Sequence, residues 1–182
     1  MLKKILIGVA VLAFVAIAAL LYLNNRNRTL SPPGKAEISS GDITVSIPYS
    51  RPSVRGRLIF GTKEEGALQP HGAYWRLGAN ESTEITINRD VLFNGIPVKK
   101  GTYKIYAFPG PDEFEIRLNT ELGTWGYMEP DESMDILSTK VPVQRLENSV
   151  EQYTIKLEPT EVGINIAFEF SNVRFVVPLT RS

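Results

Sequence analysis

The chain has 182 residues, no cysteine, and 20 basic residues against 20 acidic ones. Four of the basic residues, Lys3, Lys4, Arg26 and Arg28, lie in the first 28 residues, which contain no acid, so the remainder has 16 basic residues against 20 acidic ones. A domain with this small negative charge is not suited to nucleic acid, whose binding depends on clustered Lys and Arg. The missing cysteine excludes disulfides, thiolate nucleophiles, sulfur-based zinc sites and a lipoprotein anchor.

The first predicted element is a membrane-spanning helix over Ile5 to Leu23. This segment carries no charge, and at about 1.5 Å per residue it nearly crosses a hydrocarbon core of about 30 Å. The alternative is a cleaved signal peptide, whose apolar core is about 7–15 residues long and ends at a small-x-small site. Because the one such site, Ala16-Ile17-Ala18, is followed by further apolar residues up to Leu23, we expect an uncleaved anchor.

Charge does not decide the orientation of this helix, because two basic residues lie on each side of it. The short tail before Ile5 is typical of a signal anchor, which leaves that tail in the cytoplasm. We therefore expect a single-pass protein of the bacterial inner membrane with its main domain on the periplasmic side. Residues 1–28 form the anchor with its polar flanks, 29–35 a tether containing Ser31-Pro32-Pro33-Gly34, and 36–182 the domain.

From about residue 36 the apolar residues alternate with polar ones, which is the pattern of half-buried strands. The alternating runs are Ile43–Ile47, Ile85–Ile87, Phe114–Leu118, Tyr153–Leu157, Ile164–Phe170 and Val173–Leu179. Asn94-Gly95 predicts a hairpin between Val91–Phe93 and Ile96–Val98. Pro109-Gly110-Pro111-Asp112 predicts a turn between Thr102–Phe108 and Glu113–Asn119, and Ser171-Asn172 is expected to join the last two strands. The chain is therefore predicted to be all-β, an antiparallel, jelly-roll-like β-sandwich preceded by one transmembrane helix.

Residues 49–82 depart from plain alternation and combine arginines with aromatic residues and glycines. Guanidinium groups bind carboxylates, and an indole face stacks on sugars. A candidate ligand-binding site therefore consists of Arg51, Arg57, Trp75, Arg76, Asn80 and Glu81. In the alternative interpretation the arginines form ion pairs that close one end of the sandwich, and Trp75 fills the core.

Other residues give weaker indications of chemistry. His71 is the only histidine and has no ligand spacing around it, so no metal site and no cofactor are predicted. There is no G-x-S-x-G motif, and a glycosidase pair of carboxylates would have to come from residues such as Glu81 and Asp135. Trp125-Gly126-Tyr127 is expected in a loop, either as a contact for a sugar or partner or as a plug over the sandwich.

Several motifs of the chain resemble the bacterial family catalogued as domain of unknown function 2911. The motifs that carry the resemblance are Tyr49-Ser50-Arg51-Pro52-Ser53, Gly56-Arg57, Ile59-Phe60-Gly61, Trp75-Arg76, Gly78-Ala79-Asn80-Glu81, Asn94-Gly95, Gly101-Thr102-Tyr103 and Phe108-Pro109-Gly110. The resemblance covers residues 33–180 and implies a β-rich, secreted or envelope-associated domain with no assigned activity. The long apolar segment differs from the family's usual short export signal.

These observations favour a membrane-anchored envelope domain of non-enzymatic binding or scaffold type. Its expected partners are the membrane, through Ile5 to Leu23, and a protein or a glycan. One alternative is an accessory single-helix subunit of a larger membrane complex, packed through small helix residues such as Gly8 and Ala13. The other is a hydrolase acting on envelope polysaccharide.

Overall fold

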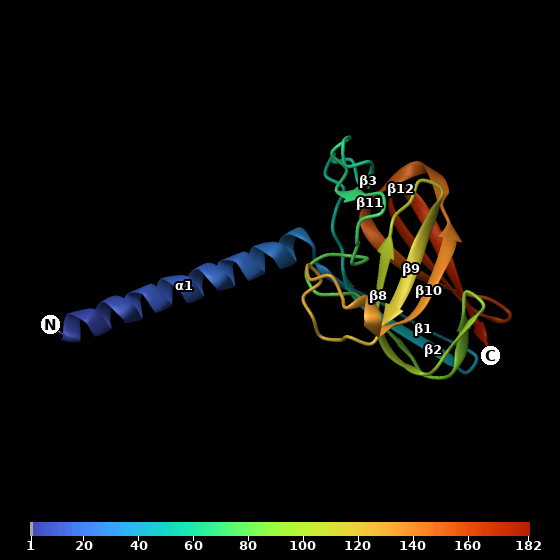
Figure 1. The fold of residues 1–182 in the computed structure, drawn as a ribbon, viewed down its shortest axis with the longest axis horizontal. Coiled ribbons are helices and arrows are strands. Elements are labelled where there is room, and N and C mark those ends of the chain that lie inside the picture. The colour runs from blue at the N-terminus through green and yellow to red at the C-terminus, as the bar shows by residue number, and fades with distance from the viewer. Residues whose placement is uncertain (1) are drawn as a thin grey trace.

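The computed structural model describes residues 2–182 and shows a long helix that projects from a β domain (Figure 1). Helix α1 (Leu2–Leu30) is long and apolar enough to cross a membrane. The predicted apolar helix over Ile5 to Leu23 is therefore confirmed, but it continues seven residues farther. Pro32, which has no amide hydrogen and disfavours helix before it, is the first residue that stops it. Only Ser31 and Pro32 separate α1 from the first strand, so the tether expected over 29–35 is mostly helix and strand.

The first sheet has six antiparallel strands in the spatial order β1, β2, β5, β8, β9 and β10. Its strands are β1 (Pro33–Ser40), β2 (Ile43–Ser50), β5 (Glu84–Ile87), β8 (Gly101–Phe108), β9 (Glu113–Asn119) and β10 (Asp135–Pro142). The register of β8 and β9 pairs Ala107 with Ile116 across the predicted Pro-Gly-Pro-Asp turn. A one-turn 3-10 helix, Glu132–Met134, precedes β10.

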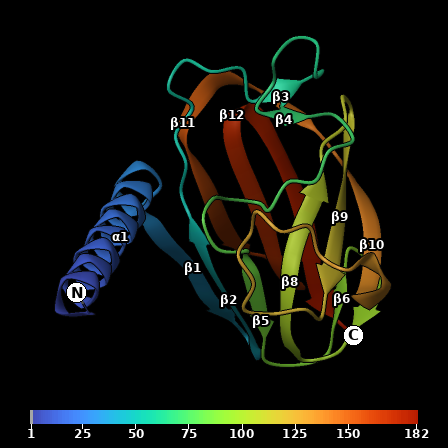
Figure 2. The same ribbon diagram turned by 60° about the vertical axis from the view of Figure 1, so that its left-hand side comes forward.

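The second sheet has four antiparallel strands in the order β11, β12, β6 and β7 and lies behind the first (Figure 2). Its strands are β11 (Gln144–Pro159), β12 (Gly163–Arg181), β6 (Val91–Phe93) and β7 (Ile96–Val98). The Asn94-Gly95 hairpin between β6 and β7 is formed as predicted, and both of its turn residues have positive φ. A small parallel pair, β3 (Phe60–Gly61) and β4 (Gln69–Pro70), lies apart from the two sheets. The antiparallel β-sandwich expected from the sequence is confirmed.

The last strand differs from the prediction, because β12 runs without a turn through Ser171-Asn172. Ser171 has a φ of +56°, and the pairing of β12 with β11 is irregular around it. A residue in this conformation makes a bulge that turns the following side chains to the other face. The core-facing apolar residues therefore have even numbers up to Phe170 and odd numbers from Val173 onward.

The space between the sheets is filled by aromatic side chains around Trp75, which is 1% exposed. Its indole contacts five rings edge-on or stacked, with centroid distances of 5.1–6.5 Å, from Phe60, Phe114, Tyr153, Phe170 and Phe175. Hydrogen bonds of 2.8 and 2.9 Å join the backbone of Trp75 to Ala107 of β8. Trp75 is therefore part of the core, as the alternative interpretation of the sequence expected.

We expect Trp75→Ala to lower the free energy of unfolding by about 3–5 kcal/mol, because it leaves a large cavity among five rings. The loss would be measured by thermal and denaturant unfolding of the full chain in detergent micelles. Trp125→Ala is the matched control, since Trp125 lies in an exposed loop, and it should change stability by less than about 0.5 kcal/mol. Equal losses in the two variants would contradict this account of the core.

Candidate functional site

The C-terminal end of α1 is held against the β domain by two arginines. Arg28 of the last turn forms an ion pair of 2.5 Å with Glu81. Arg55 donates from Nη2 to the backbone oxygen of Leu30 at 3.0 Å. The last carbonyls of a helix have no intrahelical donor, and a cation there also interacts favourably with the helix dipole. The orientation of the helix end is therefore set by contacts with the domain.

Asn80 forms the third contact with the helix end and lies in an irregular loop before β5. Its Nδ2 donates to the backbone oxygen of Ser31 at 3.2 Å and to Oγ of Ser50 at 3.3 Å. Asn80 has a φ of +59°, and Gly78 has a φ of +155°, a region that only glycine enters readily. A Cβ on Gly78 would lie 2.9 Å from the backbone oxygen of Ser50. The loop is thus packed closely onto β2.

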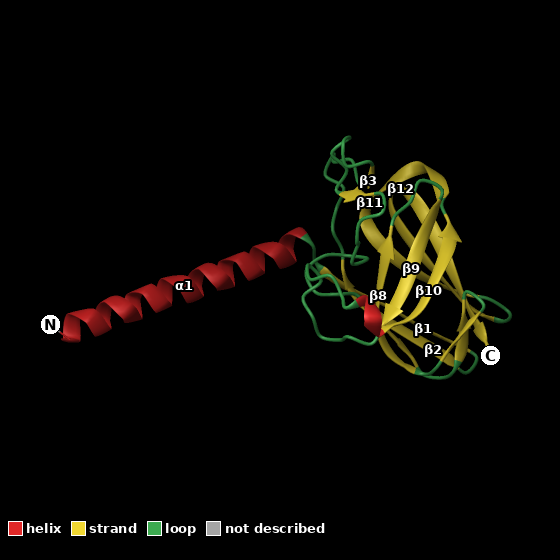
Figure 3. Ribbon diagram, in the orientation of Figure 1, coloured by secondary structure: helices red, strands yellow, loops and turns green. Residues whose placement is uncertain are grey.

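A pocket of about 410 Å³ opens where this loop, the end of α1 and three further loops meet. We call it the arginine pocket, after Arg55, Arg57 and Arg76 in its wall. Its other lining residues are Asn27, Leu30, Ser31, Pro52, Leu68, Gln69, Gly78, Ala79, Asn80, Trp125, Tyr127 and Phe170. Figure 3 shows the loops gathered at this end of the sandwich, beside the last turn of α1.

The three arginines of the pocket are cations without a carboxylate partner. Within residues 2–182 none of their guanidinium groups lies within 4.0 Å of an Asp or Glu oxygen. Arg57 donates to the backbone oxygens of Val54 and Ser53, and Arg76 donates to that of Asn80. Burial lowers the pKa of Arg76, which stays protonated at neutral pH. Each guanidinium carries five N–H donors, so donors remain for a ligand.

The structure divides the six residues of the predicted site. Arg57, Arg76 and Asn80 are brought together in the arginine pocket. Glu81 lies beside it, paired with Arg28, and lines a neighbouring pocket of about 320 Å³.

The other two residues of the predicted site lie elsewhere. Arg51 reaches β11, where its guanidinium is 3.5 Å from both Tyr153 O and Thr154 Oγ1. Trp75 is in the core and offers no exposed face to a ligand.

The lining residues outside the predicted site include one further arginine, Arg55, and two aromatic residues of a distant loop, Trp125 and Tyr127. Arg55 precedes Gly56 in a tight turn in which both residues have positive φ, and this turn places Arg55 and Arg57 in the same wall. Trp125 and Tyr127 come from the β9–β10 loop, residues 120–131, which lies about 50 residues away in sequence from Arg76. The feature of the sequence that indicated Trp125 and Tyr127 as candidates was the occurrence of two aromatic residues in a polar loop.

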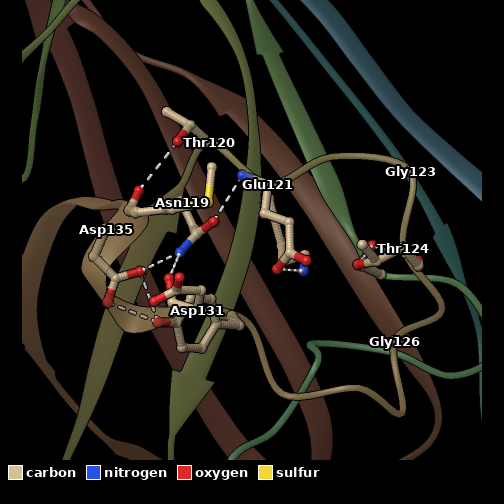
Figure 4. Close-up of polar contacts among 12 residues, drawn as sticks. Asn119, Thr120, Glu121, Gly123, Thr124, Gly126, Asp131 and Asp135 are labelled. Carbon is tan, nitrogen blue, oxygen red and sulfur yellow. Dashed lines mark hydrogen bonds and ion pairs between the residues drawn. The ribbon is translucent and has the colours of Figure 1, made fainter.

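The β9–β10 loop is fixed at its base by a network of buried polar groups (Figure 4). Asp135, at the start of β10, accepts hydrogen bonds from Tyr106 at 2.7 and 2.8 Å, from Asn119 at 2.8 Å and from Arg117 at 3.1 Å. Burial and the negative charge of Asp135 raise the pKa of Tyr106. Asn119 also donates to the backbone oxygen of Asp131 and accepts from the amide of Glu121. Both ends of the loop are therefore tied to the sheet.

The carboxylates considered for hydrolysis have structural partners. Asp135 is bound by Tyr106, Asn119 and Arg117, and Glu81 by Arg28. Neither residue lines the arginine pocket. Among residues 2–182 no three His, Asp or Glu side chains gather as metal ligands.

The comparisons with known proteins give a family but no activity. The family model described as "Protein of unknown function (DUF2911)" matches residues 31–179. The match begins directly after α1 and includes all three arginines of the pocket and the β9–β10 loop. Neither the curated proteins nor the solved structures contain a match to the chain.

We expect Gly78→Ala to destabilise the full chain by more than about 1 kcal/mol, because the new Cβ meets Ser50 O in a backbone conformation unfavourable for alanine. Gly66→Ala is the matched control, because Gly66 also has positive φ but no atom lies within 4 Å of its Cβ position. Thermal unfolding in detergent would compare the two. A Gly78→Ala variant no less stable than Gly66→Ala would mean that the loop is not packed on β2 as described.

Proposed function

The chain belongs to the family described as Protein of unknown function (DUF2911), and we propose that it is a membrane-anchored domain that binds an anionic ligand without catalysing a reaction. The observation that carries this proposal is the arginine pocket, which is lined by three arginines that have no carboxylate partner within residues 2–182. Neighbouring like charges repel one another, and a carboxylate or phosphate between them removes that cost while accepting paired hydrogen bonds.

The composition of the pocket favours binding over catalysis. Its described lining contains no Asp, Glu or His, the residues that most often act as general acids and bases. A glycosidase needs two carboxylates about 5–10 Å apart across its cleft. The aromatic rings of Trp125 and Tyr127 at the same pocket supply apolar contact area for the non-ionic part of a ligand.

We further propose that α1 is retained as a signal anchor in the bacterial inner membrane, with the β domain on the periplasmic side. Arg28, Leu30 and Ser31 dock the end of the helix on the domain. Cleavage after Ala18 would leave a short apolar stub of the helix in front of these docked residues, and this supports retention. The membrane is then the first partner of the protein, through Ile5 to Leu23.

The proposal predicts binding of small soluble anions by the full chain in detergent. Isothermal titration with sn-glycerol 3-phosphate and with D-glucuronate would test a phosphate and a carboxylate. Arg57→Gln and Arg76→Gln should each weaken binding of the preferred anion about tenfold or more, because a charged hydrogen bond contributes about 1.5–3 kcal/mol. Arg145→Gln is the matched control, since Arg145 does not line the pocket.

Unfolding temperatures of all variants would establish that the fold is intact. Failure of both anions and of membrane lipid to bind would overturn the proposal. So would binding that Arg57→Gln and Arg76→Gln leave unchanged.

A further inference from the structure

The distance of the arginine pocket from the membrane follows from helix α1, because residues of its last turn line the pocket. The apolar segment of α1 ends at Leu23, and the helix continues unbroken to Leu30. Asn27 and Leu30, which line the pocket, lie four and seven residues later, about 6 and 10 Å along the axis. The headgroup layer beyond each side of the hydrocarbon core is about 5–8 Å thick. With α1 retained in the membrane as proposed above, one edge of the pocket would therefore lie at the level of the lipid headgroups.

The β9–β10 loop exposes apolar side chains at this same end of the domain. Trp125 is 42% exposed, Tyr127 76% and Met128 59%, and Leu122 is also exposed. Figure 1 shows the loop between β9 and β10 beside the end of α1. Tyr and Trp are the residues enriched at the boundary between lipid and water, because they combine an apolar ring with a polar group. The loop thus has the composition of a membrane-contacting segment.

The loop is packed directly on the arginine pocket. The amide of Gly126 donates to Asn80 O at 3.0 Å, and Tyr74 donates to Gly126 O at 3.1 Å. A Cβ on Gly126 would lie 2.7 Å from Cδ of Arg76. Gly126 is therefore held against the Arg76 side chain, and its two neighbours, Trp125 and Tyr127, line the arginine pocket.

The charge distribution suits an anionic surface at this end of an otherwise mildly acidic domain. Arg26 and Arg28 follow the apolar segment, and the three arginines of the pocket lie beyond them. Basic residues next to a membrane helix are attracted by anionic lipids. The β9–β10 loop also carries acids, of which Glu121 is paired with Lys104 and Glu129 is exposed.

From this geometry we infer that the arginine pocket binds the anionic headgroup of a phospholipid from the leaflet in which α1 ends. The guanidinium groups hold the phosphate, and Trp125 and Tyr127 lie at the lipid–water boundary. A soluble anion would need the arginines but not the exposed apolar loop beside them. This inference names the ligand class of the proposed site and therefore rests on the proposed function.

The chain itself offers a probe of this contact, since its only two tryptophans are Trp75 in the core and Trp125 at the pocket. The full chain would be reconstituted in nanodiscs of phosphatidylcholine containing phosphatidylglycerol, with one of the two lipids brominated on its acyl chains near the glycerol. At equal bromine content, we expect brominated phosphatidylglycerol to quench tryptophan emission at least about three times as strongly as brominated phosphatidylcholine. Trp125→Phe, which retains only Trp75, should lose most of the quenching.

The double variant Arg57→Gln/Arg76→Gln should abolish the preference for phosphatidylglycerol, and Arg145→Gln should keep it. Equal quenching by the two lipids in the wild-type chain would overturn the inference, as would a preference that the double variant retains. If sn-glycerol 3-phosphate binds in an arginine-dependent way while the lipids quench equally, the pocket takes a soluble anion. The lipid inference then fails and the proposed function stands. If neither the binding of a soluble anion nor the quenching by a lipid depends on the arginines, the lipid inference and the proposed function both fail.

Discussion

The junction between α1 and the sandwich depends on hydrogen-bond donors for the unpaired backbone carbonyls at the C-terminal end of the helix. Pro32 stops the helix, and the last backbone oxygens of α1 then need donors from elsewhere. Arg55 supplies one to Leu30, Asn80 supplies another to Ser31, and Arg28 adds an ion pair with Glu81. Because Arg55 and Asn80 also line the arginine pocket, the contacts that fix the helix also form one side of the site.

The pocket is connected to the core through two consecutive residues, one of which is aromatic and buried and the other charged. Trp75 is buried among five aromatic rings and paired by its backbone with β8, whereas Arg76, the next residue, points into the pocket. Side chains of adjacent residues in extended backbone point to opposite sides. The packing of Trp75 therefore positions Arg76 without any charged partner, which leaves its guanidinium available for an external anion.

The pocket is built from segments that are far apart in the chain, and this explains the mixed outcome of the sequence prediction. The block of residues 49–82 does contain the cationic side of the site, through Arg57, Arg76 and Asn80. Trp75, in the same block, belongs to the core because the sandwich needs a large apolar group there. The aromatic side of the site comes from the β9–β10 loop, held by hydrogen bonds of Asn119 and Asp135 that no local pattern reveals.

The features that depend on local chemistry could be predicted from the amino-acid sequence. These are the apolar helix, the alternation that makes each strand amphipathic, and the Asn94-Gly95 hairpin, whose conformation its two residues prefer. The bulge of β12 at Ser171 and the ion pair of Glu81 with Arg28 depend on the tertiary fold and could not be predicted from local sequence. The tertiary fold also brings four loops and a helix end together around one pocket. Such contacts join residues that are far apart in the chain, and they are set by the packing of the two sheets rather than by any neighbouring residue.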